Sequence, residues 1–145
     1  MVADDPITYR MDLKNVDWQE MKDTLVADDF DNGRSPEQLK SSFENSHTAV
    51  VAYAGQRIIG TARALSDGVC NAYVVDVWTL TAYRHRGIAS RMMSLLEAQI
   101  SGQHVYLFTD DARDFYEQLG YRSRGLGLGK VVGEWLKTDK NQLES

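Results

Sequence analysis

The sequence has few of the residues that build disulfide bridges, metal sites and membrane spans. Its 145 residues include one cysteine, Cys70, so no internal disulfide can form. No Cys and His residues have the spacing of a zinc site. No apolar run approaches the roughly 18 residues that span a bilayer, and the first ten residues lack the basic and apolar regions of a signal peptide. We therefore expect a cytoplasmic protein with no metal and no membrane partner.

The chain also carries no net positive charge. The formal net charge is -5 at pH 7, which argues against general binding to nucleic acid. Any anion must therefore be bound by a local cluster of basic residues. Apolar residues make up 43% of the chain, enough for a packed core, and the length suits one domain over residues 1–145.

Hydrophobic periodicity predicts an α+β fold. The expected order is β-α-α-β-β-β-α-β-α-β-β, in a mixed, mostly antiparallel sheet with helices on both faces. Asp17 and Ser35 are expected N-caps of the first two helices, and Pro36 suits the first position of the second. A third helix is expected over about 87–101, and the last strands over 123–136, where residues 130–136 read KVVGEWL.

A basic turn, YRHRGIASRM, occupies residues 83–92, between a strong strand and the third helix. The first N–H groups of a helix have no intrahelical partner, and the helix dipole makes that end positive. A phosphate placed there accepts several N–H bonds, and Gly87 lets the backbone approach it closely. Arg84 and Arg86 add charge, so the turn is a candidate pyrophosphate site. The alternative is a solvated basic loop that only caps the helix.

Two other phosphate-binding loops are excluded. The turn lacks the glycines of G-x-G-x-x-G, and the chain has no G-x-x-x-x-G-K-[ST]. The segment GLGLGK, residues 125–130, neither follows a strong strand nor opens a helix, which argues against a dinucleotide-binding oxidoreductase.

The run from Arg84 to Ala89 fits the pattern Q/R-x-x-G-x-G/A, and FYEQLGY follows at 115–121. With its strand-turn-helix setting, the stretch 72–122 resembles the GNAT superfamily of N-acetyltransferases, and the element order extends the resemblance over nearly the whole chain. The resemblance implies that acetyl-CoA donates an acetyl group to an amine. It also implies a bulged strand whose backbone pairs with the pantetheine arm, and amides that bind the pyrophosphate. The implied cofactor-binding residues are Val77, Trp78, Thr79, Arg84, His85, Arg86, Gly87, Ile88, Ala89, Ser90, Tyr116 and, where the family often has Asn, Thr109.

Tyr116 matches the tyrosine that acts as general acid in this family. A phenol, with a reference pKa of about 10, can protonate a departing thiolate, whose reference pKa is about 8.5. The alternative is a core aromatic residue beside Phe115. The general base is open between Asp76 and a chain of waters, because Asp76 can instead be a structural acid paired with Arg63. Asp110, Asp111 and His47 are weaker candidates for the base.

The acceptor is predicted less directly. Asp28, Asp29 and Asp31, in the loop after the first helix, would attract a cationic amine, or form a solvated turn. An aromatic wall or ordinary core packing explains Trp18, Phe30 and Tyr73 equally well. The segment 62–78 is similar to the plastid and cyanobacterial branch that includes arylalkylamine acetyltransferases, which favours a small amine.

Three alternatives about function and assembly stay open. The chain can be a non-catalytic acyl-CoA sensor, although the presence of Tyr116 argues against that. It can also acetylate protein N-termini or lysines. Members of the family often dimerise through their C-terminal strands, and residues 130–136 would allow a homodimer of that kind.

Overall fold

The computed structural model of the protein describes residues 5–137. In chain order its elements are β1 (Ile7–Arg10), α1 (Trp18–Ala27), α2 (Pro36–Glu44), β2 (Thr48–Ala54), β3 (Arg57–Ser66), β4 (Asn71–Thr79), a 3-10 turn (Thr81–Tyr83), α3 (Ile88–Ala98), β5 (His104–Tyr106) and α4 (Arg113–Gln118). The chain divides into two compact units, residues 1–109 and 110–145. The expectation of one domain over the whole chain stays a prediction.

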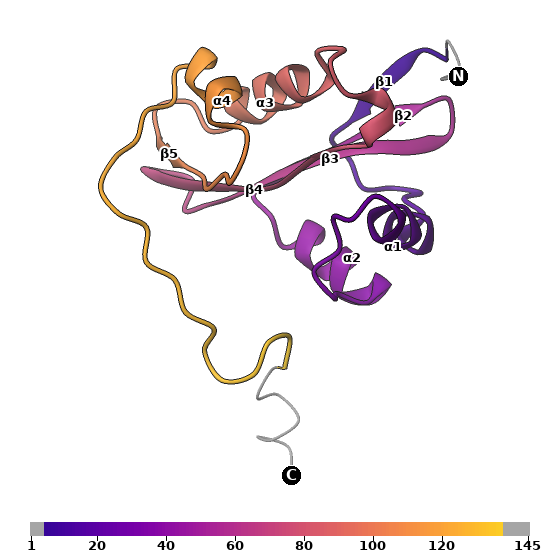
Figure 1. Ribbon diagram of the computed structural model, residues 1–145, viewed down its shortest axis with the longest axis horizontal. Coiled ribbons are helices and arrows are strands. Elements are labelled where there is room, and N and C mark those ends of the chain that lie inside the picture. The colour runs from indigo at the N-terminus through magenta and orange to yellow at the C-terminus, as the bar shows by residue number, and fades with distance from the viewer. Residues whose placement is uncertain (1–4, 138–145) are drawn as a thin grey trace. The chain divides into compact units, whose positions relative to one another are not determined.

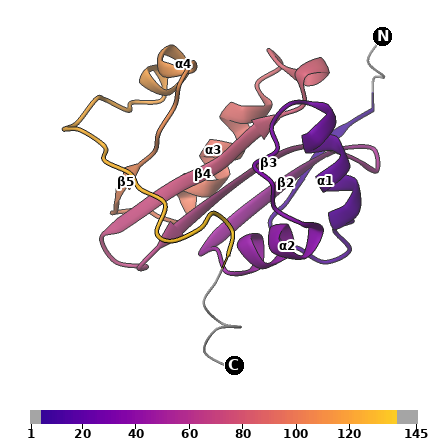
Figure 2. The same cartoon turned by 60° about the horizontal axis from the view of Figure 1, so that its bottom comes forward.

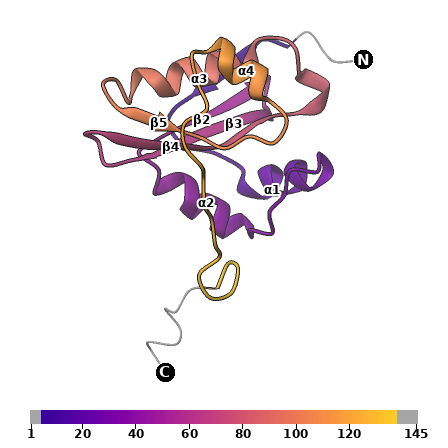
Figure 3. The same cartoon turned by 60° about the vertical axis from the view of Figure 1, so that its left-hand side comes forward.

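The first unit is built on one five-stranded sheet with the order β1-β2-β3-β4-β5 (Figure 2). The first four strands are antiparallel, and only β4 and β5 are parallel. Helices α1 and α2 cover one face of the sheet and α3 covers the other (Figures 1 and 3). The predicted α+β class, with a mixed and mostly antiparallel sheet between helices, is therefore confirmed.

The helix starts follow from local sequence. The Asp17 side chain accepts a hydrogen bond from the Glu20 N–H at 2.9 Å and caps α1. Ser35 and Gln38 form a reciprocal capping box at the start of α2, and Pro36 occupies its first turn. Both predicted N-caps are confirmed. Within residues 5–137, no helix is both long and apolar enough to cross a membrane.

The core of the first unit depends on a close approach between α3 and the sheet. Gly60 of β3 faces α3, and a Cβ built there would lie 3.2 Å from Cε of Met92 and 3.1 Å from the carbonyl oxygen of Trp78. On the opposite face, the Arg63 guanidinium lies 5.7 Å from the centroid of the Phe43 ring of α2. The absence of a side chain at residue 60 thus sets how closely the helix packs on the strands.

The predicted C-terminal strands are not formed. Among the described residues after α4, 119–137, there is no strand. Glycine at 125, 127 and 129 weakens strand formation. The leucines between them, Leu126 and Leu128, are both 92% exposed and so gain nothing from packing. The prediction from residues 130–136 of a strand that could pair two chains is wrong at the level of secondary structure.

Gly60→Ala should lower the free energy of unfolding by about 1–3 kcal/mol, because the added methyl overpacks a tight contact. Denaturant unfolding of both proteins measures the difference. Gly129→Ala is the control, since a Cβ there meets nothing within 4 Å. If Gly60→Ala lowers the free energy of unfolding no more than Gly129→Ala does, the neighbours of residue 60 move aside at no cost and the contact does not limit the packing of α3.

Candidate functional site

The start of α3 presents free backbone donors. The first helical hydrogen bond runs from the Arg91 N–H to the Gly87 carbonyl at 3.0 Å. The N–H groups of Ile88, Ala89 and Ser90 precede it and have no partner among the described residues. Three convergent donors at the positive end of an 11-residue helix suit an anion such as a phosphate.

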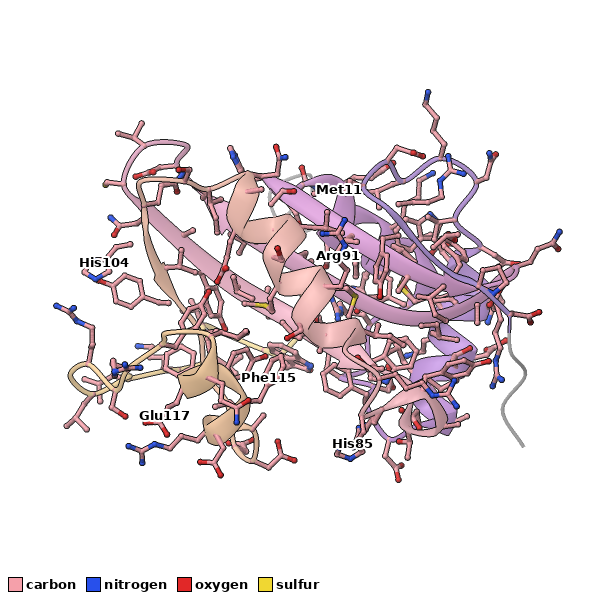
Figure 4. All side chains as sticks on the ribbon, turned by 90° about the horizontal axis from the view of Figure 1, so that it is seen from above. Met11, His85, Arg91, His104, Phe115 and Glu117 are labelled. Carbon is pink, nitrogen blue, oxygen red and sulfur yellow. The ribbon has the colours of Figure 1, made fainter. Side chains whose placement is uncertain are left out.

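The backbone just before α3 is left-handed at two residues. Gly87 is the N-cap, with φ 78°, and His85 also has a positive φ of 65°. Successive amides around left-handed residues form concave nests that bind anions. A Cβ placed on Gly87 meets no atom within 4 Å, so the space in front of the turn is open. Figure 4 shows the His85 side chain at this end of α3. The helix thus begins one residue later than predicted, at Ile88, and Gly87 serves as its cap.

Two of the basic side chains flank this turn, which we call the cradle (residues 84–90). Arg84 donates from Nε to the carbonyl of Thr79 at 3.3 Å, and the Arg86 guanidinium lies 5.3 Å from the Tyr83 ring centroid. A guanidinium held over a ring keeps its N–H edge available for phosphate oxygens. Arg91 instead extends toward β1, where its charge opposes the rise in the pKa of Tyr9 that burial causes.

Strand β4 leads to the cradle along an open edge. Its parallel pairing with β5 covers only Asn71–Tyr73. Within residues 5–137, no strand pairs with this edge of β4 beyond Tyr73. The hydroxyl oxygen of Thr79 is buried without a hydrogen-bond partner in the described part of the chain. An extended polar ligand could pair with the backbone along this edge.

The bulge expected in this strand is present, at Asp76 and Val77. Thr61 pairs with Trp78 and Arg63 with Val75, so two residues of β4 face the single residue Ala62. Asp76 has φ 57°, which is unusual for a residue other than glycine. The expected backbone positions Val77, Trp78 and Thr79 therefore follow directly after the bulged residue.

Two arginines hold the Asp76 side chain. Arg34 donates from Nη1 and Nη2 to the two carboxylate oxygens, each at 3.0 Å, and Arg63 donates from Nε at 2.6 Å. The side chains of Arg34, Arg63 and Asp76 are only 8%, 12% and 12% exposed. The structural alternative for Asp76, an acid paired with Arg63, is therefore what the structure contains, and the carboxylate has no oxygen left free of an arginine.

The loop between α1 and α2, residues 28–35, contacts β4 at a second point. The Asp28 carboxylate accepts hydrogen bonds from Trp78 Nε1 at 2.9 Å and from the Thr81 N–H at 3.1 Å. Burial alone would raise the pKa of Asp28, but these hydrogen bonds and the charge of Arg84 lower it overall. Asp31 pairs with Lys22 at 2.7 Å. Two of the three acids expected to attract an amine are therefore engaged within the protein.

Tyr116 belongs to the second unit, as the buried residue of α4. Its ring packs edge-on against Phe115 and Tyr121, with centroid separations of 4.9 and 5.9 Å. Burial, and secondly the negative charge of Asp111, raise the pKa of Tyr116. The phenol therefore keeps its proton at neutral pH and well above. Thr109, at the end of the first unit, is exposed.

The remaining candidates separate into core and surface residues. His47 is exposed beside Gly68 in the turn between β3 and β4. Trp18 packs on Phe43 with ring centroids 5.5 Å apart, which is core packing. Tyr73 is 38% exposed and meets Phe108, which is 70% exposed, edge-on at 5.9 Å. Exposed aromatic side chains therefore do lie at the β4–β5 edge.

Sequence reasoning missed Arg34 and Thr61. Arg34 lies in a polar loop and gives no periodic signal, yet it is 7% exposed. The Thr61 hydroxyl donates to the Asp76 carbonyl at 2.8 Å. The one local hint was Asp76 itself, a carboxylate within an apolar strand, because such a group requires a partner.

Comparisons with known proteins agree with this arrangement. A family model for the acetyltransferase (GNAT) domain matches residues 45–123, more than half of the chain. A GNAT-family acetyltransferase from Streptococcus pneumoniae superposes with a TM-score of 0.73 at 22% identity, over 89% of this chain and 100% of that one. Glucosamine-6-phosphate N-acetyltransferase from Arabidopsis thaliana gives 0.68 at 13%, over 89% and 100%.

A protein called a transcriptional regulator, from Bacillus halodurans, also shares the fold. It gives a TM-score of 0.68 at 23% identity, over 88% of this chain and 100% of that one. At such identities the likeness concerns the fold alone. The narrower plastid and cyanobacterial branch stays a prediction.

Gly87→Glu should reduce the affinity for acetyl-CoA at least about 100-fold, because a carboxylate would stand where phosphate oxygens bind. Isothermal titration measures the loss. Gly102→Glu is a matched control, with φ 81° and open space around its Cβ, and it carries the same backbone strain. Equal affinity in the two folded variants would contradict the placement of the anion at the cradle.

Proposed function

The chain belongs to the GNAT family of acetyltransferases, and we propose that it transfers the acetyl group of acetyl-CoA to the primary amine of a small molecule. The transfer is direct, with donor and acceptor bound together. The observation that carries the proposal is the cradle of free amides at α3, directly after a bulged strand with an open edge.

The donor is bound by groups of the first unit. The diphosphate of CoA accepts hydrogen bonds from the amides of Ile88, Ala89 and Ser90, with Arg84 and Arg86 beside it. The pantetheine arm pairs with the open edge of β4 after Tyr73. This support comes from the free donors and from the edge that lacks a strand.

The reaction forms one bond and breaks one. The neutral amine nitrogen attacks the thioester carbonyl carbon, and the carbonyl oxygen of the tetrahedral intermediate is stabilised by a backbone N–H at the bulge. The attacking nitrogen, positively charged once it has bonded to carbon, gives one proton to water. The C–S bond then breaks, and the thiolate takes the proton of the Tyr116 phenol. The products are the acetylated amine and CoA, and the phenolate recovers its proton from the solvent.

A water chain, not Asp76, removes the surplus proton of the amine. An alkylammonium group has a reference pKa of about 10.4, so the amine must lose a proton before it attacks. Both oxygens of Asp76 already accept hydrogen bonds from arginines. Protonation of Asp76 would leave the buried charges of Arg34 and Arg63 without a carboxylate partner, which costs free energy.

The acceptor amine carries an apolar or aromatic group. The support is the pair Tyr73 and Phe108, exposed at the β4–β5 edge. Charge attraction from the α1–α2 loop contributes less than the sequence suggested, since Asp28 and Asp31 are engaged. Asp29 is the remaining acid of that group.

A panel of aryl and alkyl amines tests the function by thiol release from acetyl-CoA. Release that depends on an amine supports catalysis. A second candidate function is that of a non-catalytic acyl-CoA sensor, because a protein called a transcriptional regulator has the same fold. Tight acetyl-CoA binding with no release for any small amine, lysine peptide or N-terminal peptide would favour that sensor.

Tyr116→Phe should lower kcat about 10²- to 10⁴-fold, the usual contribution of a positioned general acid. The dissociation constant of acetyl-CoA should change less than about threefold, because the ring remains. Single-turnover kinetics beside titration separates the two effects. Tyr9→Phe, on β1, is the control for loss of a tyrosine hydroxyl, and an equal effect in both variants would exclude Tyr116 as the acid.

A further inference from the structure

We infer that Arg34 is a positioning residue for the thioester. It acts through Asp76, which it holds in the left-handed conformation that shapes the bulge. The inference rests on the proposed function, because it concerns the backbone donor that meets the acetyl carbonyl. Arg34 itself lies in the α1–α2 loop, outside both the cradle and β4.

The first step is the conformation of Asp76. An L-residue at φ 57° is disfavoured sterically, although Asp tolerates it better than most residues. Such a residue persists where its surroundings fix it. Arg34 from the α1–α2 loop and Arg63 from β3 fix Asp76 with three hydrogen bonds to its carboxylate.

The second step is the direction of the next peptide group. The Thr61 hydroxyl donates to the carbonyl oxygen of Asp76 at 2.8 Å. In a trans peptide the carbonyl and the following N–H point in opposite directions. The Val77 N–H therefore points away from the Thr61 hydroxyl. The arginine bonds to the Asp76 side chain and the Thr61 bond to its carbonyl together fix the direction of the Val77 N–H.

The third step is what Arg34 itself requires. Its Nε donates to Oδ1 of Asn32 at 2.9 Å, so the guanidinium is oriented by its own loop. Arginine forms this planar, bidentate contact with a carboxylate, and lysine cannot reproduce it. The same loop also contacts the chain just after the bulge, because Asp28 accepts hydrogen bonds from Trp78 of β4 and from the Thr81 N–H of the 3-10 turn. The loop therefore contacts the chain both at the bulge and directly after it.

The test compares two ligands that differ only at the carbonyl. Acetyl-CoA has the carbonyl oxygen, and S-ethyl-CoA has a methylene in its place. Wild-type protein should bind acetyl-CoA about 3- to 10-fold more tightly than S-ethyl-CoA, the value of one hydrogen bond. Arg34→Lys should bring that ratio to about one while the affinity for S-ethyl-CoA stays within about twofold, because only the carbonyl contact is lost.

The control is Lys22→Gln, which removes the ion pair between Lys22 and Asp31 of the same loop without touching β4. Its ratio should equal that of the wild type. Thermal unfolding checks that each variant is folded. If Arg34→Lys does not fold, Thr61→Val replaces it. Val has nearly the same shape and lacks the hydroxyl that fixes the peptide, so the same fall in the ratio is expected.

The outcomes separate the inference from the function. A wild-type ratio of one, or an unchanged ratio in the folded variants, overturns the inference. A ratio that falls as expected supports it even if no amine releases CoA, in which case the proposed transfer alone fails. If wild-type protein binds neither ligand, the function and the inference both fail.

Discussion

The bulge in β4 exists because one carboxylate is held by two arginines. The left-handed conformation of Asp76 costs roughly 1–2 kcal/mol for an L-residue, whereas removing one partner of a buried ion pair costs about 3–5 kcal/mol. Loss of either arginine would therefore cost more than the strain that the Asp76 backbone carries. The bulge is therefore a fixed feature of the strand, and β4 reaches the cradle with its backbone already turned.

This constraint joins parts of the chain that are distant in sequence. Arg34 comes from the loop after α1, Thr61 and Arg63 from β3, and Asp76 from β4. On the other face of the sheet, Gly60 lets α3 pack closely. One stretch of β3 and β4 therefore packs both around the bulge and against α3, the helix whose first amides form the cradle.

The features that the sequence predicted correctly are those set by neighbouring residues, such as helix caps and turns. Asp17 and Ser35 cap the first two helices, Gly87 marks the start of α3, and the pattern around it identified the family. It did not predict Arg34, because a buried arginine in a polar loop has no periodic signature and its partner lies 42 positions away. It predicted a strand over residues 130–136, and the structure has none there. The acids of the α1–α2 loop were noticed, but a count of charges does not show that Asp28 holds Trp78.

The two units of the chain contain different groups. The first contains the free amides at the start of α3, the open edge of β4 and the bulge. The second contains a buried tyrosine, Tyr116, whose pKa is raised by burial and by the charge of Asp111.

A crystal structure of the protein with bound acetyl-CoA would show where the diphosphate and the thioester lie. We expect diphosphate oxygens within hydrogen-bonding distance of the Ile88, Ala89 and Ser90 amides, and the thioester oxygen on the Val77 N–H. A diphosphate bound elsewhere, or a carbonyl oxygen turned away from the bulge while Arg34 still holds Asp76, would contradict this expectation.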